Sequence, residues 1–164
     1  MSRQLRASTP IPSSTAQPRS SLARPTRLKW PAVSLSSQLT AYGFPYLVAV
    51  IDGTVVGYAY AGPYRTRPAY RFTVENSVYV AHDSHRRGVG KALLQALIDA
   101  CTEKGFRLMV AVIGDSKQAA SIGLHEEAGF KHVGVFENIG YKFDGWLDSV
   151  LMQRALGPGA SKPP

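Results

Sequence analysis

The pattern of apolar and polar positions divides the chain near residue 43. Beyond that point, short apolar runs are separated by Gly, Pro and Asp, as in a folded domain. The first two runs, 46–51 and 55–60, flank Asp52-Gly53, a dipeptide typical of a two-residue hairpin turn. The pattern therefore predicts an antiparallel pair of strands at the start of the domain.

Downstream of this hairpin, Gly62-Pro63 is expected to end the second strand, and 64–71 is expected to be a basic, aromatic loop. A third strand is predicted over 72–80 from its rough alternation. Apolar residues then recur every three or four positions, and Lys104-Gly105 is typical of a helix end. The positions that predict this helix are Val89, Leu93, Leu94, Leu97, Ile98 and Cys101.

A continuous apolar run over 108–113 predicts a strand buried on both faces of a sheet. Gly114 and Ser116 indicate the start of a second helix, which we expect to end at Ala128-Gly129.

Two further strands, 130–139 and 146–156, are predicted to complete the sheet. Strands 72–80 and 108–113 are joined by a helical crossover over 88–104, a connection that makes them parallel. The predicted fold class is α/β, a mixed central sheet with crossover helices.

Composition separates the first 40 residues from the rest. They contain 18 Ser, Thr or Pro residues, six basic residues and no acidic residue. The whole chain carries a net charge of +8, so most of that charge comes from this segment. Such a segment buries too little apolar surface to offset its chain entropy. We expect a disordered basic tail over 1–40, a domain over 41–157 and a flexible tail over 158–164.

Length and composition exclude several classes of protein. At 164 residues with 45% hydrophobic content, the chain fits one globular domain. No apolar stretch reaches the roughly 18 to 20 residues of a membrane span, and no secretory signal is recognisable, so we expect a cytoplasmic protein. The single cysteine, Cys101, is expected in the core, and no Cys/His spacing indicates a metal site.

A candidate anion-binding segment lies where strand 72–80 leads into the first helix. Glycine permits close backbone approach, the first-turn N–H groups and the helix dipole favour phosphate oxygens, and basic side chains add charge. The spacing fits neither a Walker loop nor a Rossmann fingerprint, and a tight turn with solvated arginines remains an alternative. The segment comprises Arg86, Arg87, Gly88, Val89, Gly90 and Lys91.

Several motifs together resemble one known family. His85-Arg-Arg-Gly-Val-Gly90 resembles the pyrophosphate loop of the GNAT acyltransferase superfamily, and Leu124–Phe130 resembles its closing helix. Four further segments are similar to the phosphinothricin N-acetyltransferase branch: 59–63, 74–80, 110–114 and 140–146. The resemblance implies an N-acetyltransferase that uses acetyl-CoA as co-substrate and a small amino-acid-like amine as acceptor, without metal.

The resemblance also assigns residues to acetyl-CoA. Backbone groups of Val78, Tyr79 and Val80 would contact the pantetheine arm, and Arg86 to Lys91 would hold the pyrophosphate. This chain has His85 where relatives usually have Gln or Arg. It has Gln118 where they commonly have Asn, so a side-chain contact there is less well supported.

For catalysis, the resemblance makes Glu75 the leading base, directly or through water, and His125 a candidate proton relay. A solvated strand glutamate and a structural histidine remain the alternatives. Arg65, Arg67 and Tyr70 fall where the branch contacts the acidic end of its substrate, and guanidinium groups suit a carboxylate or phosphinate.

The family's habit of dimerising leads us to expect a homodimer, with Phe143 and Trp146 as packing or interface residues. Trp146 also lies within one of the segments that carry the resemblance.

Relatives begin with a strand and two helices that residues 1–40 do not match. One hypothesis is a shifted reading frame or a misassigned start. Two alternatives to an active enzyme follow from the same segment. One is a catalytically impaired acetyl-CoA-binding remnant, and the other is a nucleic-acid-binding module that depends on the basic tail.

Overall fold

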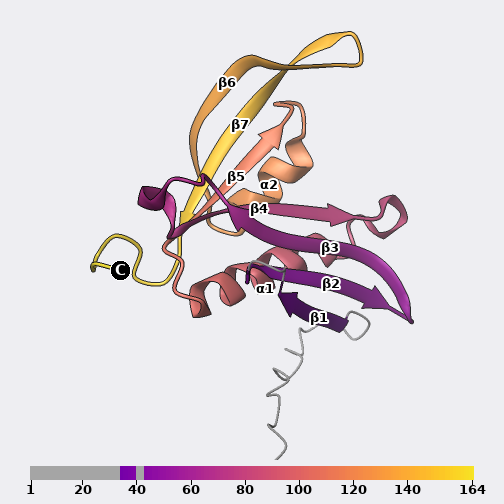
Figure 1. The fold of residues 1–164 in the computed structure, drawn as a ribbon. Helices are drawn as coiled ribbons and strands as arrows, with labels where there is room; N and C mark the ends of the chain where they lie inside the picture. Colours follow the sequence, from indigo (N-terminus) through magenta and orange to yellow (C-terminus); the bar gives the residue numbers. More distant parts are fainter. Residues whose placement is uncertain (1–33, 40–42) are drawn as a thin grey trace, which may run out of the picture.

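A computed structural model describes residues 34–39 and 43–164, which form one seven-stranded sheet in the order β1-β2-β3-β4-β5-β7-β6 (Figure 1). Only β4 and β5 pair in parallel among these neighbours. The predicted mixed α/β sheet is therefore confirmed. Its strands are β1 (Ser34–Leu39), β2 (Pro45–Ile51), β3 (Thr54–Pro63), β4 (Thr73–Val80), β5 (Leu108–Gly114), β6 (Lys131–Lys142) and β7 (Gly145–Ala155). The helices are α1 (Val89–Glu103) and α2 (Ala119–Glu127), with short 3-10 helices at Pro68–Tyr70 and His82–Ser84.

The predicted β2–β3 hairpin forms as expected. Ile51 pairs with Thr54, and the two residues between them, Asp52 and Gly53, have φ angles of +48° and +77°. Two successive positive φ angles match the right-handed twist of a hairpin, which explains why Asp-Gly stands here.

The sheet has one strand that the sequence analysis did not predict. Residues 34–39, which were expected in the unstructured tail, form β1 and pair antiparallel with β2 from Ser34↔Val50 to Leu39↔Pro45. An edge strand is held by backbone hydrogen bonds, so it requires no apolar run of its own. The expectation for residues 1–33 lies outside the described residues.

Helix α1 packs on β2, β3 and β4 and forms most of the core on that side of the sheet. Its apolar stripe is buried as its spacing predicts, and Cys101 is fully buried within it. Gly57 of β3 fits closely beneath the helix, because a Cβ there would lie 2.7 Å from the carbonyl oxygen of Tyr79 and 3.1 Å from Leu93. Gly57 therefore permits close packing between β3, β4 and α1.

Strand β5 is buried on one face, not on both as predicted. Met109, Ala111 and Ile113 are buried, whereas Val112 between them is 40% exposed. Met109, Ala111 and Ile113 belong to the hydrophobic core, and helix α2 contacts this strand. Although residues 108–113 are all apolar, buried and less buried side chains alternate along the strand.

Helix α2 begins later than predicted, at Ala119. The preceding residues form a turn instead: the backbone N–H of Lys117 donates to the Asp115 side chain at 2.9 Å, and that of Gln118 donates to the Asp115 carbonyl at 3.0 Å. An aspartate that bonds the backbone two residues later is a common turn device. The helix end near Ala128-Gly129 is confirmed, with Gly129 at φ +82°.

The C-terminal hairpin of β6 and β7 projects from the body of the molecule (Figure 1). Beyond β7 the chain has no further helix or strand among the described residues, yet Arg107 donates hydrogen bonds to the carbonyls of Gly159 and Pro163. Residues 158–164, expected to be a flexible tail, are thus in contact with the domain. In the described part of the chain, no helix is long and apolar enough to cross a membrane.

Candidate functional site

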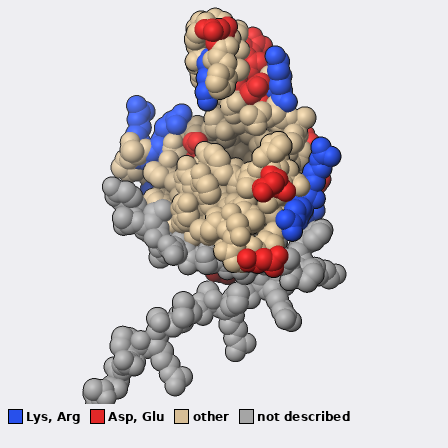
Figure 2. Space-filling view, turned by 90° about the vertical axis from the view of Figure 1, so that its right-hand side faces the viewer, with Lys and Arg blue, Asp and Glu red and all other residues tan. Residues whose placement is uncertain are grey.

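The candidate site lies where β4 and β5 separate. Their parallel pairing covers only three residue pairs, from Thr73↔Leu108 to Glu75↔Val110, although both strands continue beyond it. Figure 1 shows the two strands diverging from this point. Figure 2 faces the side toward which β4 points, and shows the surface hollowed below the projecting hairpin. The site residues come from the elements around this opening.

Glu75 is the last residue of β4 that pairs with β5. It lies opposite Val110 of β5 and Gly62 of β3. Its side chain is half-buried. Burial raises the pKa of the Glu75 carboxyl above its ordinary value, and the positive charge of Arg65 opposes part of this rise. A carboxylate with a raised pKa at the point of strand separation is suited to accept a proton.

The loop after β3 carries the predicted substrate-binding residues beside this carboxylate. The backbone N–H of Tyr64 donates to the Thr73 carbonyl at 3.4 Å, which holds the loop against the start of β4. The guanidinium of Arg65 lies over the Tyr64 ring at 4.5 Å, and Tyr70 packs edge-on against the same ring. All three side chains are exposed on the loop, and Arg65 lies within electrostatic reach of Glu75.

The start of α1 has the geometry expected of an anion-binding turn. Gly88 precedes the helix in the left-handed conformation, at φ +78°, and among the described residues no side chain caps the first-turn N–H groups there. Arg86 also has a positive φ, +59°, and both Arg86 and Arg87 are exposed. Gly90 lies close to Leu124 and Val80, at 3.4 and 3.5 Å from its Cβ position, so the helix start meets α2 and β4. These uncapped N–H groups and nearby guanidinium groups fit a phosphate-bearing ligand.

Lys91, predicted to bind the same anion, forms an ion pair with Glu127 of α2 at 3.3 Å. Both side chains are about two-thirds exposed, so this pair is readily exchanged for other partners. Val89, the remaining member of the segment, is buried against the core and does not present its side chain to a ligand.

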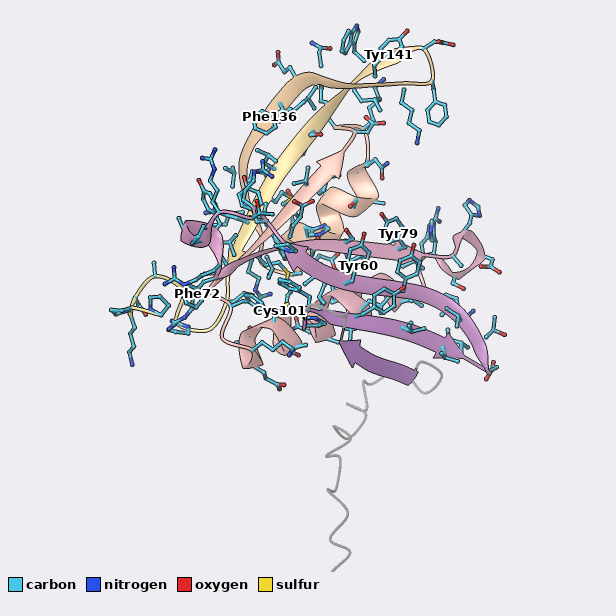
Figure 3. All side chains as sticks on the ribbon, in the orientation of Figure 1. Tyr60, Phe72, Tyr79, Cys101, Phe136 and Tyr141 are labelled. Carbon is cyan, nitrogen blue, oxygen red and sulfur yellow. The ribbon has the colours of Figure 1, made fainter. Side chains whose placement is uncertain are left out.

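The predicted pantetheine-contacting residues lie on β4 beyond Glu75, where the strand pairs with β3 but not with β5. The side chains of Val78 and Val80 pack against the core, and Tyr79 lies on the opposite face, stacked on Tyr58 at 4.8 Å. Figure 3 shows Tyr79 and Tyr60 on these adjacent strands, and Tyr60 is the largest cause that raises the pKa of Tyr79. The carbonyl of Val80 accepts a hydrogen bond from Nε2 of His85 at 3.1 Å. Gln118 lies apart from them, exposed at the start of α2.

His125 is buried on α2, with 4% of its surface exposed. Its Nδ1 lies 2.8 Å from the Ser121 carbonyl, and its ring packs edge-on against Phe130 at 5.0 Å. Burial lowers the pKa of His125, while the hydrogen bond to Ser121 acts in the opposite direction. Burial therefore favours the neutral form of the imidazole.

Asn76 is a site residue that the sequence analysis did not identify. It follows Glu75 on β4, is 93% buried, and its Oδ1 lies 3.3 Å from Nε2 of His125. Among the described residues, no atom accepts a hydrogen bond from its Nδ2. A sequence signal exists: Asn76 stands between Val74 and Val78, where the alternation of β4 calls for an apolar side chain.

Charge does not gather into one basic surface on the face shown in Figure 2. Lys and Arg side chains are interspersed there with Asp and Glu. A nucleic-acid interface would present a continuous basic stripe or patch. This face gives no support to the nucleic-acid alternative.

Comparison with known proteins is consistent with this geometry. The profile described as the acetyltransferase (GNAT) family matches residues 14–130. The chain is 52% identical over 117 residues to a phosphinothricin N-acetyltransferase from Alcaligenes faecalis, covering 71% of this chain and 59% of that protein. It is 47% identical over 122 residues to an L-methionine sulfoximine/L-methionine sulfone acetyltransferase from Pseudomonas paraeruginosa, covering 74% and 70%. The chain thus spans about three fifths of the length of the first relative.

A solved structure is similar over the same part. The phosphinothricin acetyltransferase from Sinorhizobium meliloti, in complex with acetyl-CoA, has a TM-score of 0.74 and 46% sequence identity. The match covers 77% of this chain and 68% of that one. The arrangement of strands and helices around the opening is therefore shared with a protein whose structure holds that compound.

Proposed function

Because this chain belongs to the acetyltransferase (GNAT) family, we propose that it transfers an acetyl group from acetyl-CoA to the amine of a small amino-acid-like substrate. The observation that carries the proposal is the position of Glu75, a half-buried carboxylate where β4 separates from β5. The names of the relatives favour a phosphinothricin or methionine-sulfone type of acceptor.

The start of α1 would hold the pyrophosphate of acetyl-CoA. Gly88 and Gly90 allow close approach of the backbone, and Arg86, Arg87 and Lys91 add positive charge. Bound acetyl-CoA supplies the activated thioester carbonyl. The backbone of Val78, Tyr79 and Val80, on the part of β4 that does not pair with β5, would contact its pantetheine arm. Gln118, at the start of α2, would also contact acetyl-CoA.

In the proposed reaction, the substrate arrives as an ammonium ion and must lose a proton before its nitrogen can attack. Glu75 accepts that proton, directly or through water, and its raised pKa brings its basicity closer to that of the amine. The nitrogen forms a bond to the thioester carbon and loses a second proton, the carbon–sulfur bond breaks, and the departing thiolate takes up a proton. His125, buried on α2, is the candidate relay for the proton that the thiolate takes up.

The acidic end of the substrate would be bound by the loop after β3. Arg65 is held over Tyr64 and lies within electrostatic reach of Glu75, so it can pair a carboxylate while the amine faces the base. Arg67 and Tyr70 are exposed on the same loop, available to extend this binding surface.

The same proposal includes a homodimer formed through the β6–β7 hairpin. The hairpin exposes a series of large apolar side chains, a feature typical of interaction sites. Figure 3 shows Phe136 and Tyr141 on it, away from the core. The exposed residues are Val133, Val135, Phe136, Ile139, Tyr141, Phe143 and Trp146. A second copy of this chain is the proposed occupant, since such a surface can be self-complementary about a two-fold axis.

The test of activity is release of CoA from acetyl-CoA, detected with a thiol reagent, across phosphinothricin, methionine sulfone and ordinary amino acids. We expect amine-dependent release that falls about 10²- to 10⁴-fold in kcat/KM in Glu75→Gln. We also expect the acid limb of the wild-type pH profile to lie above the ordinary Glu value of 4.5, because the base acts when deprotonated.

Glu103→Gln, at the exposed end of α1, is the matched control and should retain wild-type rates. Calorimetric binding of acetyl-CoA without release for any amine would instead identify the impaired remnant. The dimer is tested separately by light scattering. Phe143→Asp should yield monomers if the hairpin is the interface, and an unchanged mass would contradict that part of the proposal.

A further inference from the structure

The contact between Asn76 and His125 joins two side chains that are both more than nine-tenths buried. Nδ1 of His125 lies 2.8 Å from the Ser121 carbonyl oxygen. A carbonyl oxygen only accepts hydrogen bonds, so Nδ1 must carry a hydrogen. The protonation state of the ring is then decided at Nε2, the atom that faces Asn76 at 3.3 Å.

The two charge states of His125 require opposite ends of the Asn76 carboxamide. In the neutral ring, Nε2 holds a lone pair and needs a donor, which Oδ1 cannot be. A half-turn of the carboxamide places Nδ2 there, and gives a partner to the amide nitrogen that otherwise has none among the described residues. In the protonated ring, Nε2–H donates to Oδ1, the orientation that the structure shows.

We propose that Asn76 is a positioning residue for His125, whose carboxamide pairs with Nε2 in either charge state of the ring. A buried polar group left unpaired costs free energy, so a partner that only donates or only accepts would favour one charge state over the other. The half-turn of Asn76 removes this bias. His125 is thereby able to gain and lose a proton while its ring stays fixed by Ser121 and Phe130.

Other charged groups near His125 are directed elsewhere. On α2, Glu126 and Glu127 are exposed and pair with His132 and Lys91. On β4, Glu75 points to the opposite face of the strand from Asn76, because successive strand residues alternate. Among the described residues, the ring also contacts Phe130 and the Ser121 carbonyl, and Asn76 is the side chain that faces Nε2.

The experiment is histidine nitrogen NMR of the full chain, which distinguishes the ring tautomers and follows protonation with pH. In the wild type, we expect the Nδ1–H tautomer and protonation of His125 below the ordinary histidine value of 6.5. Asn76→Asp, which only accepts, should move the protonation of His125 upward by about one pH unit or more. Gln153→Glu, the same amide-to-acid change at an exposed position of β7, should leave it unmoved.

The role of this contact in turnover rests on the proposed function and is measured separately. Asn76→Leu, similar in size but unable to hydrogen-bond, should lower kcat about 10- to 100-fold with KM for acetyl-CoA changed less than about twofold. Asn76→Ser, which both donates and accepts, should recover part of the rate.

An Nε2–H tautomer in the wild type, or no upward shift in Asn76→Asp, would overturn the proposal. The NMR result does not depend on turnover, so absence of activity in every variant, with the expected spectra, would count against the proposed function alone. Expected spectra with an unchanged kcat in Asn76→Leu would overturn the positioning role.

Discussion

The two helices α1 and α2 each follow a strand of the parallel pair, but they are held in place differently. Helix α1 buries seven of its 15 residues, all of them apolar. Helix α2 buries one of its nine, and that residue is His125. At its end, Arg154 of β7 donates a hydrogen bond to the Ala128 carbonyl. The first helix is fixed by a fully buried apolar stripe, whereas the second combines partly buried apolar contacts, from Ile122 and Leu124, with polar ones.

This difference separates the scaffold from the chemistry. A continuous apolar stripe can place a helix firmly, but it offers no group that transfers protons. A helix held by hydrogen bonds keeps ionisable side chains at the opening between β4 and β5, and its stability depends on their protonation. We therefore expect changes in α1 to affect mainly folding, and changes in α2 to affect mainly pH dependence.

The largest effect should come from the core of α1. Leu94→Ala removes a fully buried side chain, and the remaining cavity should lower the free energy of unfolding by about 2–5 kcal/mol. Urea denaturation followed by circular dichroism measures this loss. Glu103→Ala, on the exposed side of the same helix, should change stability by less than about 0.5 kcal/mol. A small loss in Leu94→Ala would contradict the role of α1 as the packed scaffold.

The next effect concerns pH and α2. Burial lowers the pKa of His125 in the folded state, so the unfolded chain takes up this proton first as the pH falls through 6.5. The free energy of unfolding should therefore decrease with acidification, by at most about 1.4 kcal/mol per pH unit from this group. Denaturation between about pH 7.5 and 5.5 measures the slope. His125→Gln should reduce it, and an identical slope would show that His125 is not the cause.

The smallest effect should come from the ion pair between the helices, Lys91–Glu127. Both side chains are about two-thirds exposed, so a double-mutant cycle with alanine should give a coupling energy of about 0.2–1 kcal/mol, reduced by added salt. A larger, salt-insensitive coupling would contradict the exposed, weakly held character of this pair.

The difference between α1 and α2 also explains which elements of the fold the sequence predicts. Helix α1 follows from spacing alone, because its stripe repeats over four turns and Gly88 and Gly105 mark its ends. The start of α2 does not, since Asp115 forms a local turn whose hydrogen bonds compete with helix formation. Strand β1 was missed because an edge strand is specified by its neighbour's backbone and not by its own composition.

For the candidate site, the sequence predicts Glu75 and the turn that contains Gly88 and Gly90, because both lie in short, contiguous motifs. The contact of Asn76 with His125 joins residues 49 positions apart, so no local pattern contains it. Only an Asn at an apolar position of β4 hints at such a partner, and the hint does not say where that partner lies.

The short ladder between β4 and β5 has a mechanical consequence. Three residue pairs are the only backbone pairing between a half-sheet of β1 to β4 and a half-sheet of β5 to β7 in the described chain. Beyond this ladder the two halves are joined by side chains, namely the shared hydrophobic core, Asn76–His125 and Lys91–Glu127. Amide hydrogens along β4 beyond Glu75 should then exchange with solvent faster than those of β3.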